Sequence, residues 1–162
     1  MGDLSEHFSL AELTVHPSTP DLDNSPDQDS RQRLAKLASY ILERARTTLG
    51  TPINVTSAYR SPAVNAAIGG SETSSHQYGC AADCVPVGIN ILVAYKALMD
   101  DAGLIYDQLI YEQKGTREGH THWIHIGMEA PLHPVARRQA LIYGPLTHGK
   151  YLPFNEALVS FT

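Results

Sequence analysis

The sequence has few cysteines, no excess of basic residues and no long apolar run. Only two cysteines, Cys80 and Cys84, occur among 162 residues, which excludes the disulfide framework that holds many small secreted domains together. Lys and Arg total 12 against 17 Asp and Glu, a net charge of −5, and this argues against nucleic acid or an anionic membrane surface as a partner. No segment approaches the ~20 apolar residues that span a bilayer, so we expect no membrane insertion.

The remaining composition is typical of one globular domain. The chain is 43% hydrophobic over its 162 residues, which is enough for one sizeable core. Residues 1–6 lack the basic and apolar segments of a secretory signal. We therefore expect synthesis as a soluble cytoplasmic chain, and a substrate outside the membrane would need a separate route of delivery.

Cys80 and Cys84 flank a three-residue step, 81–83. In an extended segment their Cα atoms would lie more than about 7 Å apart, too far for a disulfide. We expect both to be reduced, half-buried residues. A zinc site of two cysteines and a histidine is the alternative, which is disfavoured because better candidate ligands stand beside them.

Hydrophobic spacing predicts helices first and short strands later. The clearest element is a helix that begins near Ser25 and Pro26, which suit a cap and a first turn, and ends before Gly50. Shorter helices are predicted at 63–68 and 89–99 from the same 3.6-residue spacing. Strands are predicted from β-branched and alternating segments at 53–59, 80–87, 105–112, 122–128 and 139–143.

This order of elements predicts an α+β fold. We expect a single domain, 1–162, with a mostly antiparallel central sheet and helices packed on one side. Residues 1–24 are interpreted as an N-terminal arm, and residues 129–162 as a C-terminal extension with one strand and a loose tail. Residues 113–119 are interpreted as a flexible loop because of their composition.

The candidate chemistry lies in two segments, 74–83 and 119–127. They contain His76, Asp83 and His125 at positions where neighbouring strands and loops can converge. Zinc accepts imidazole nitrogen and carboxylate oxygen, and a catalytic site keeps the fourth position open. Gly79 allows the chain to turn between His76 and Asp83. The residues alone leave a metal site and an ordinary structural role for the histidines equally open.

Three motifs resemble the zinc D-alanyl-D-alanine peptidase family. Residues 74–83 read Ser-x-His-x-x-Gly-x-Ala-x-Asp, residues 123–125 read Trp-Ile-His, and residues 57–65 read Ser-Ala-Tyr-Arg-Ser-Pro-Ala-Val-Asn. The resemblance covers residues 4–128. The family includes D-Ala-D-Ala carboxypeptidases, dipeptidases and phage endolysins, and its fold is shared with hedgehog signalling domains.

The resemblance implies a single Zn²⁺ held by His76, Asp83 and His125. It also implies that Arg60 faces the substrate, where a guanidinium can hold a carboxylate or a developing oxyanion; a structural salt bridge is the alternative for this residue. The same resemblance implies that Ser74 either contacts the substrate or stabilises the conformation of its own loop. Trp123 shares a face of its strand with His125 and either lines the cleft or belongs to the core.

The general base departs from the family pattern. Several relatives have Glu or Asp three residues before the last ligand histidine, where this chain has His122. Another relative uses a histidine five residues before that ligand, which corresponds to His120, and Glu112 is the nearest carboxylate on a neighbouring strand. We rank His122 first, His120 second and Glu112 third. On a regular strand His122 and His125 point to opposite faces, so the first choice requires a bulge or a strand end.

The resemblance implies a zinc metallopeptidase that hydrolyses peptidoglycan stem or cross-link peptides, as a D-Ala-D-Ala carboxypeptidase or an endopeptidase. A member without a signal resembles phage lytic enzymes, which are released by a holin or carried in the virion and act on the bacterial cell wall. The missing acidic base favours one alternative, a non-catalytic zinc-binding virion or cell-wall-binding domain. A metal-free globular domain is the third interpretation.

Overall fold

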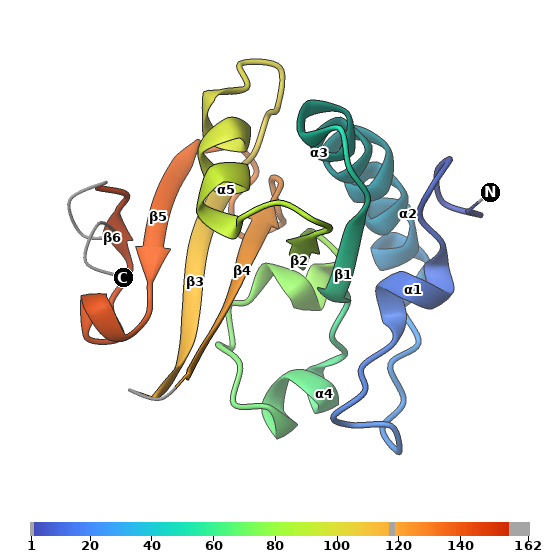
Figure 1. Cartoon of the computed structure of the whole chain (residues 1–162). Coiled ribbons are helices and arrows are strands. Elements are labelled where there is room, and N and C mark those ends of the chain that lie inside the picture. Colours follow the sequence, from blue (N-terminus) through green and yellow to red (C-terminus); the bar gives the residue numbers. More distant parts are fainter. Residues whose placement is uncertain (1, 117–118, 156–162) are drawn as a thin grey trace.

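The computed structural model describes residues 2–116 and 119–155, without the side chains of residues 116, 119 and 120. A six-stranded sheet in the order β1-β2-β4-β3-β5-β6 forms its centre (Figure 1). Neighbouring strands are antiparallel except for β3 and β5, which are parallel. The strands are β1 (Ile53–Ser57), β2 (Ala81–Pro86), β3 (Gln108–Thr116), β4 (Gly119–Gly127), β5 (Gln139–Tyr143) and β6 (Leu152–Pro153). This confirms the predicted α+β fold with a mostly antiparallel sheet.

The predicted long helix is continuous but begins later than expected. It comprises α2 (Gln28–Lys36), a π-helical stretch η1 (Leu37–Leu42) and α3 (Glu43–Leu49). Asp27, rather than Ser25, is the N-cap, because its carboxylate accepts a hydrogen bond from the Ser30 amide at 2.7 Å. The helix ends as predicted at Gly50, which has a positive φ of 63°.

The other helices are short, apart from α5. They are α1 (Leu10–Thr14), α4 (Pro62–Ala67), η2 (Ser75–Tyr78), α5 (Ile91–Asp100) and η3 (Pro145–Thr147). The N-terminal arm is packed against the rest of the protein, because Phe8 and Leu13 belong to the hydrophobic core. None of the helices in the described part of the chain is long and apolar enough to cross a membrane.

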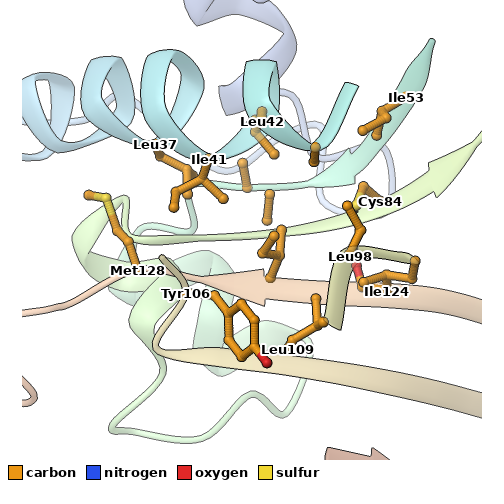
Figure 2. Close-up of a cluster of buried hydrophobic side chains, with 14 of the residues drawn as sticks. Leu37, Ile41, Leu42, Ile53, Cys84, Leu98, Tyr106, Leu109, Ile124 and Met128 are labelled. Carbon is orange, nitrogen blue, oxygen red and sulfur yellow. Dashed lines mark hydrogen bonds between the residues drawn. The ribbon is translucent and has the colours of Figure 1, made fainter. Parts of the chain in front are cut away.

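The alternation of side chains gives the sheet two different faces. Leu37, Ile41 and Leu42 of the long helix pack toward Cys84 and Ile124 on one face (Figure 2). The same core contains the other inward positions of the central strands and the buried side of α5, among them Ala82, Leu98, Leu109, Tyr111 and Ile126. The intervening strand positions point to the opposite face, where the polar residues of the cleft described below are found. Cys80 and Cys84 are both free and fully buried.

The C-terminal extension differs from the expected loose tail. β5 occupies the predicted residues, but it pairs with β3 in parallel, Ile110 lying beside Leu141. β6 then pairs with β5. The segment 113–119 was predicted to be a loop, and in the described residues it continues the two strands up to Thr116 and from Gly119. The hydrogen-bonding capacity of paired backbones outweighs the weak strand propensity of Lys114 and Gly115 there.

Candidate metal centre and active site

His76, Asp83 and His125 come together at the centre of the sheet, each from a different element. His76 lies in η2, Asp83 in β2 and His125 in β4, and Asp83 is directly opposite His125 in the β2–β4 pair. The Nε2 atom of His76 is 3.2 Å from Nδ1 of His125 and 3.3 Å from Oδ1 of Asp83. Nδ1 of His125 is 3.0 Å from the same carboxylate oxygen. Three donor atoms therefore form a nearly equilateral triangle.

This triangle fits zinc. A zinc ion at about 2.0–2.1 Å from each donor, with tetrahedral angles, requires donors about 3.3 Å apart. Two imidazole nitrogens and one carboxylate oxygen are ligands of the type that zinc prefers, and the three residues are buried. The site could therefore hold a divalent ion with three protein ligands and leave one coordination position for water or substrate.

The surrounding structure fixes the orientation of His76. Its Nδ1 donates to the backbone carbonyl of Ala58 at 2.6 Å, which leaves the Nε2 lone pair directed into the triangle. Burial lowers the pKa of His76, which favours the neutral form that binds metal. Gly79 ends η2 with a φ of 70°, and a Cβ there would lie 2.8 Å from the carbonyl oxygen of Ser30. Only glycine suits both this turn and this close approach to α2.

Arg60 orients the candidate ligand Asp83. Its Nη2 donates to Oδ2 of Asp83 at 2.5 Å, and its Nε donates to the hydroxyl of Ser57 at 2.8 Å. These bonds use two of the five guanidinium donors, and Arg60 also lines the cleft. Burial raises the pKa of Asp83, but the neighbouring His76 and His125 outweigh it and hold the pKa well below the usual range. Asp83 is thus a carboxylate with one oxygen held by Arg60 and the other in the triangle.

A cleft of about 500 Å³ surrounds the three candidate ligands. Its floor is the polar face of the sheet, where Ile110, Glu112 and Lys114 alternate along β3 and Trp123 and His125 along β4. One wall is the loop between α4 and η2, which includes Ser74; the sequence-predicted residues Arg60, Ser74, Glu112 and Trp123 all line the cleft. The buried indole nitrogen of Trp123 has no hydrogen-bond partner among the described residues.

Among the described residues that line the cleft, Glu112 is the acidic side chain outside the triangle. Burial in the cleft is the main cause that raises its pKa to about 7, with a smaller opposing effect from His125. The indole N–H of Trp123, directly opposite on β4, also lowers this pKa slightly, although the two groups do not meet ordinary hydrogen-bond geometry. A carboxyl group with this pKa can accept and return a proton near neutral pH.

His122 lies on the other face of the sheet, which corrects our first choice for the general base. Its Nδ1 is 2.6 Å from the hydroxyl of Tyr111, and both residues line a separate pocket of about 840 Å³ beside the N-terminus of α5. The β3–β4 register is continuous from Gln108 to Thr116, so the bulge that His122 would need is absent there. The side chain of His120, our second choice, lies outside the described residues.

Three residues of the second wall were not predicted from the sequence. His133, Arg137 and Tyr151 belong to the C-terminal extension and line the cleft. Arg137 makes a bidentate ion pair with Asp107 at 2.8 and 2.6 Å, and Tyr151 stacks on Tyr143. No motif marks them, and the parallel pairing of β5 with β3, which brings them to the cleft, could not be derived from hydrophobic spacing.

Comparison with known proteins agrees with the motifs and the fold. The family model described as peptidase M15 matches residues 6–127, nearly the same segment as the resemblance drawn from the motifs. The comparison with curated proteins gave no significant match. The match covers most of the chain, including all three candidate ligands. The chain therefore belongs to the peptidase M15 family, a family of zinc-dependent peptidases.

Proposed function

We propose that the protein is a zinc peptidase that hydrolyses stem or cross-link peptides of peptidoglycan, with His76, Asp83 and His125 as metal ligands and Glu112 as general base. The observation that carries this proposal is the combination, in one cleft, of a zinc-sized donor triangle and a buried carboxyl group with a pKa of about 7. The sequence has no acidic residue three positions before His125, and this favoured a non-catalytic domain. Glu112 supplies such an acidic group from the neighbouring strand.

In this proposal, different residues of the cleft have different roles in hydrolysis. When bound, zinc polarises the scissile carbonyl and lowers the pKa of water. Glu112 accepts a proton from the attacking water molecule and later delivers it to the leaving amine. Hydrolysis in this form needs no covalent acyl-enzyme, so a nucleophilic serine is not required.

Arg60 has two roles in this proposal. It holds Asp83 in the orientation that a metal ligand needs, through the bond to Oδ2. Its remaining N–H donors stabilise negative charge on the carbonyl oxygen as the tetrahedral species forms. Ser74 and Trp123, which border the same cleft, contact the bound peptide.

Peptidoglycan peptides are proposed as the substrate class because of the family and its motifs. We propose a D-Ala-D-Ala carboxypeptidase or endopeptidase specificity and a lytic role in a bacteriophage, with delivery to the cell wall through a holin or in the virion. The parts of this proposal that concern substrate and delivery can be tested independently of the metal site.

Digestion of purified muropeptides tests the function directly. The zinc-loaded protein should release products with a new amine terminus, identified by mass spectrometry, and a chelator should abolish them. His125→Ala should lose both bound zinc and cleavage, since it removes one of three ligands. Stoichiometric zinc in that variant would contradict the ligand assignment. A zinc-loaded wild-type sample that cleaves no muropeptide would contradict the enzymatic proposal.

A further inference from the structure

The C-terminal extension continues the floor of the cleft beyond Glu112. Glu112 pairs with Trp123 on one side and with Tyr143 on the other. Ile142 of β5 pairs with Leu152 of β6, so the next position along the pair brings Tyr151 beside Tyr143. The two tyrosine rings stack with centroids 4.4 Å apart and an angle of 24° between their planes. A row of side chains thus crosses β4, β3 and β5 and ends at Tyr151, the residue before β6.

Gly144 holds this part of the extension close to β3. It has a φ of 152°, and a Cβ there would lie 2.8 Å from both Cβ and the carbonyl oxygen of Gln113. The chain can therefore approach β3 between Glu112 and Lys114 only with glycine at this position. Tyr151 and Lys114 border the same cleft as Glu112.

Lys114 differs from the two arginines of the cleft. Arg60 is paired with Asp83 and Arg137 with Asp107. Lys114 is exposed, and it makes no hydrogen bond or ion pair with any described residue. Its ammonium group therefore carries a charge that no described carboxylate neutralises, at the border of a cleft that would also hold a divalent cation. Such a position attracts an anionic group.

Tyr151 supplies a second donor in the same cleft. The residue is 57% exposed and borders the cleft. Burial of part of the ring, followed by the charge of Glu112, raises the pKa of Tyr151 to about 12, so the phenol keeps its proton at neutral pH. The stacked Tyr143 limits the movement of the ring, which reduces the entropy lost on binding.

We propose that Lys114 and Tyr151 form a subsite for a carboxylate group of the peptide substrate. Lys114 lies two residues beyond Glu112, which is about 7 Å along a strand, or two residues of an extended peptide. The carboxylate therefore belongs to a residue within about two positions of the scissile bond. This inference rests on the proposed function and makes the substrate an acidic peptide. It also gives Tyr151, which lies beyond the segment matched by the family model, a part in substrate selection.

Peptides that differ only in one carboxylate test the subsite. The zinc-loaded protein is given the pentapeptide L-Ala-γ-D-Glu-L-Lys-D-Ala-D-Ala, together with analogues in which the D-Glu α-carboxylate or the C-terminal carboxylate is an amide. Amidation of one of them should lower kcat/KM about 10- to 100-fold, the effect of losing a charge-assisted hydrogen bond, and should do so mainly through KM.

Variants identify the residues that are responsible. Lys114→Gln should reduce the acid-to-amide ratio of kcat/KM to near 1, Tyr151→Phe should reduce it in part, and Lys114→Arg should preserve it. Lys150→Gln, next to Tyr151 but outside the cleft, is the matched control and should leave the ratio unchanged.

The outcomes separate this inference from the proposed function. Equal cleavage of acid and amide peptides by the wild-type protein would overturn the subsite and leave the peptidase assignment intact. A Lys114→Gln variant that keeps the wild-type ratio would overturn the role of Lys114. Failure to cleave any of the peptides, or the muropeptides, would instead count against the proposed function.

Discussion

The role proposed for Glu112 depends on the environment of its side chain. The same side chain on an exposed strand would be fully ionised at neutral pH, whereas burial between Trp123 and the candidate ligands raises its pKa to about 7. A cation bound nearby would favour the carboxylate and shift this pKa downward. The ionised, proton-accepting form thus predominates at and above neutral pH.

Glu112→Gln should retain zinc and lose about 10²–10⁴ in kcat, because the amide cannot accept the proton of the attacking water. In the wild-type protein, kcat/KM should fall as the pH decreases through an apparent pKa at or below about 7, and this acidic limb should disappear in the variant. Zinc content and pH–rate profiles measure both effects. Turnover close to that of the wild type would show that another residue is the general base.

The stability of the Glu112→Gln variant is the control for its loss of activity. Because burial disfavours the charged form of Glu112, the metal-free Glu112→Gln protein should be at least as stable as wild type above pH 7. Thermal unfolding in the presence of a chelator measures this. A large decrease in Tm would indicate that the variant loses activity because it unfolds.

In contrast to Glu112→Gln, His122→Gln should leave catalysis nearly unchanged. His122 contacts Tyr111 on the face of the sheet away from the candidate ligands, so zinc content should be unchanged and kcat/KM should stay within about threefold of wild type. Loss of the bond to Tyr111 should cost about 1 kcal/mol of stability. A decrease in kcat comparable to that of Glu112→Gln, at unchanged zinc content, would restore His122 as the base.

At the scale of elements, the ion pair of Asp107 with Arg137 joins the start of β3 to the extension. Arg137 donates to the carboxylate from its backbone amide and from two guanidinium nitrogens, and the Asp107 side chain is only 2% exposed. Burial raises the pKa of Asp107, but these hydrogen bonds outweigh it and the pKa is lowered. The pair therefore contributes stability above the pKa of the unfolded state, near 4, which is lost as the pH falls through the lower folded-state value.

Arg137→Met should destabilise the protein by about 2–3 kcal/mol at pH 7, because it leaves a buried carboxylate without its cation. The deficit should shrink as the pH is lowered toward 3, where Asp107 can be protonated in the variant. Chemical denaturation at several pH values measures this. Arg31→Met, at an exposed position, is the control, and a deficit independent of pH would contradict the role of the charge.

Local signals predicted elements well and connections poorly. Hydrophobic spacing gave the helix that ends at Gly50 and the strand Gln139–Tyr143, because both depend on residues close in sequence. The family motifs predicted the three residues that form the donor triangle. The parallel β3–β5 pair and the cleft residues of the extension depend on contacts between segments about 30 residues apart, for which the sequence carries no periodic signal.

At the scale of the whole molecule, the extension is part of the structural core as well as of the cleft. Ile142 is completely buried, and the hydroxyl of Tyr95 in α5 donates to the carbonyl of Leu141 at 3.1 Å. β5 also pairs with one edge of β3 and satisfies the backbone hydrogen-bonding groups there. The segment matched by the family model ends before these contacts begin, so it lacks part of the core.

A chain that ends at residue 128 should therefore fail to form a stable fold, since it exposes the edge of β3 and part of the core. A chain that ends at residue 155 retains all the contacts described and serves as the control. Circular dichroism and thermal unfolding of the two proteins distinguish the cases. A cooperative transition in the shorter chain near the Tm of the control would show that the extension is dispensable for folding.

The unbroken β3–β4 register has a consequence for changes in chain length. Deleting one residue of β3 before Glu112 would exchange the faces of the residues that follow, so that Gln113 and Gly115 would take the places of Glu112 and Lys114 on the floor of the cleft. Charged groups would then enter the core, and the protein would lose its stability together with its chemistry. Evolution can therefore change the length of these two strands by pairs of residues, whereas single-residue insertions and deletions inside them should be eliminated by selection.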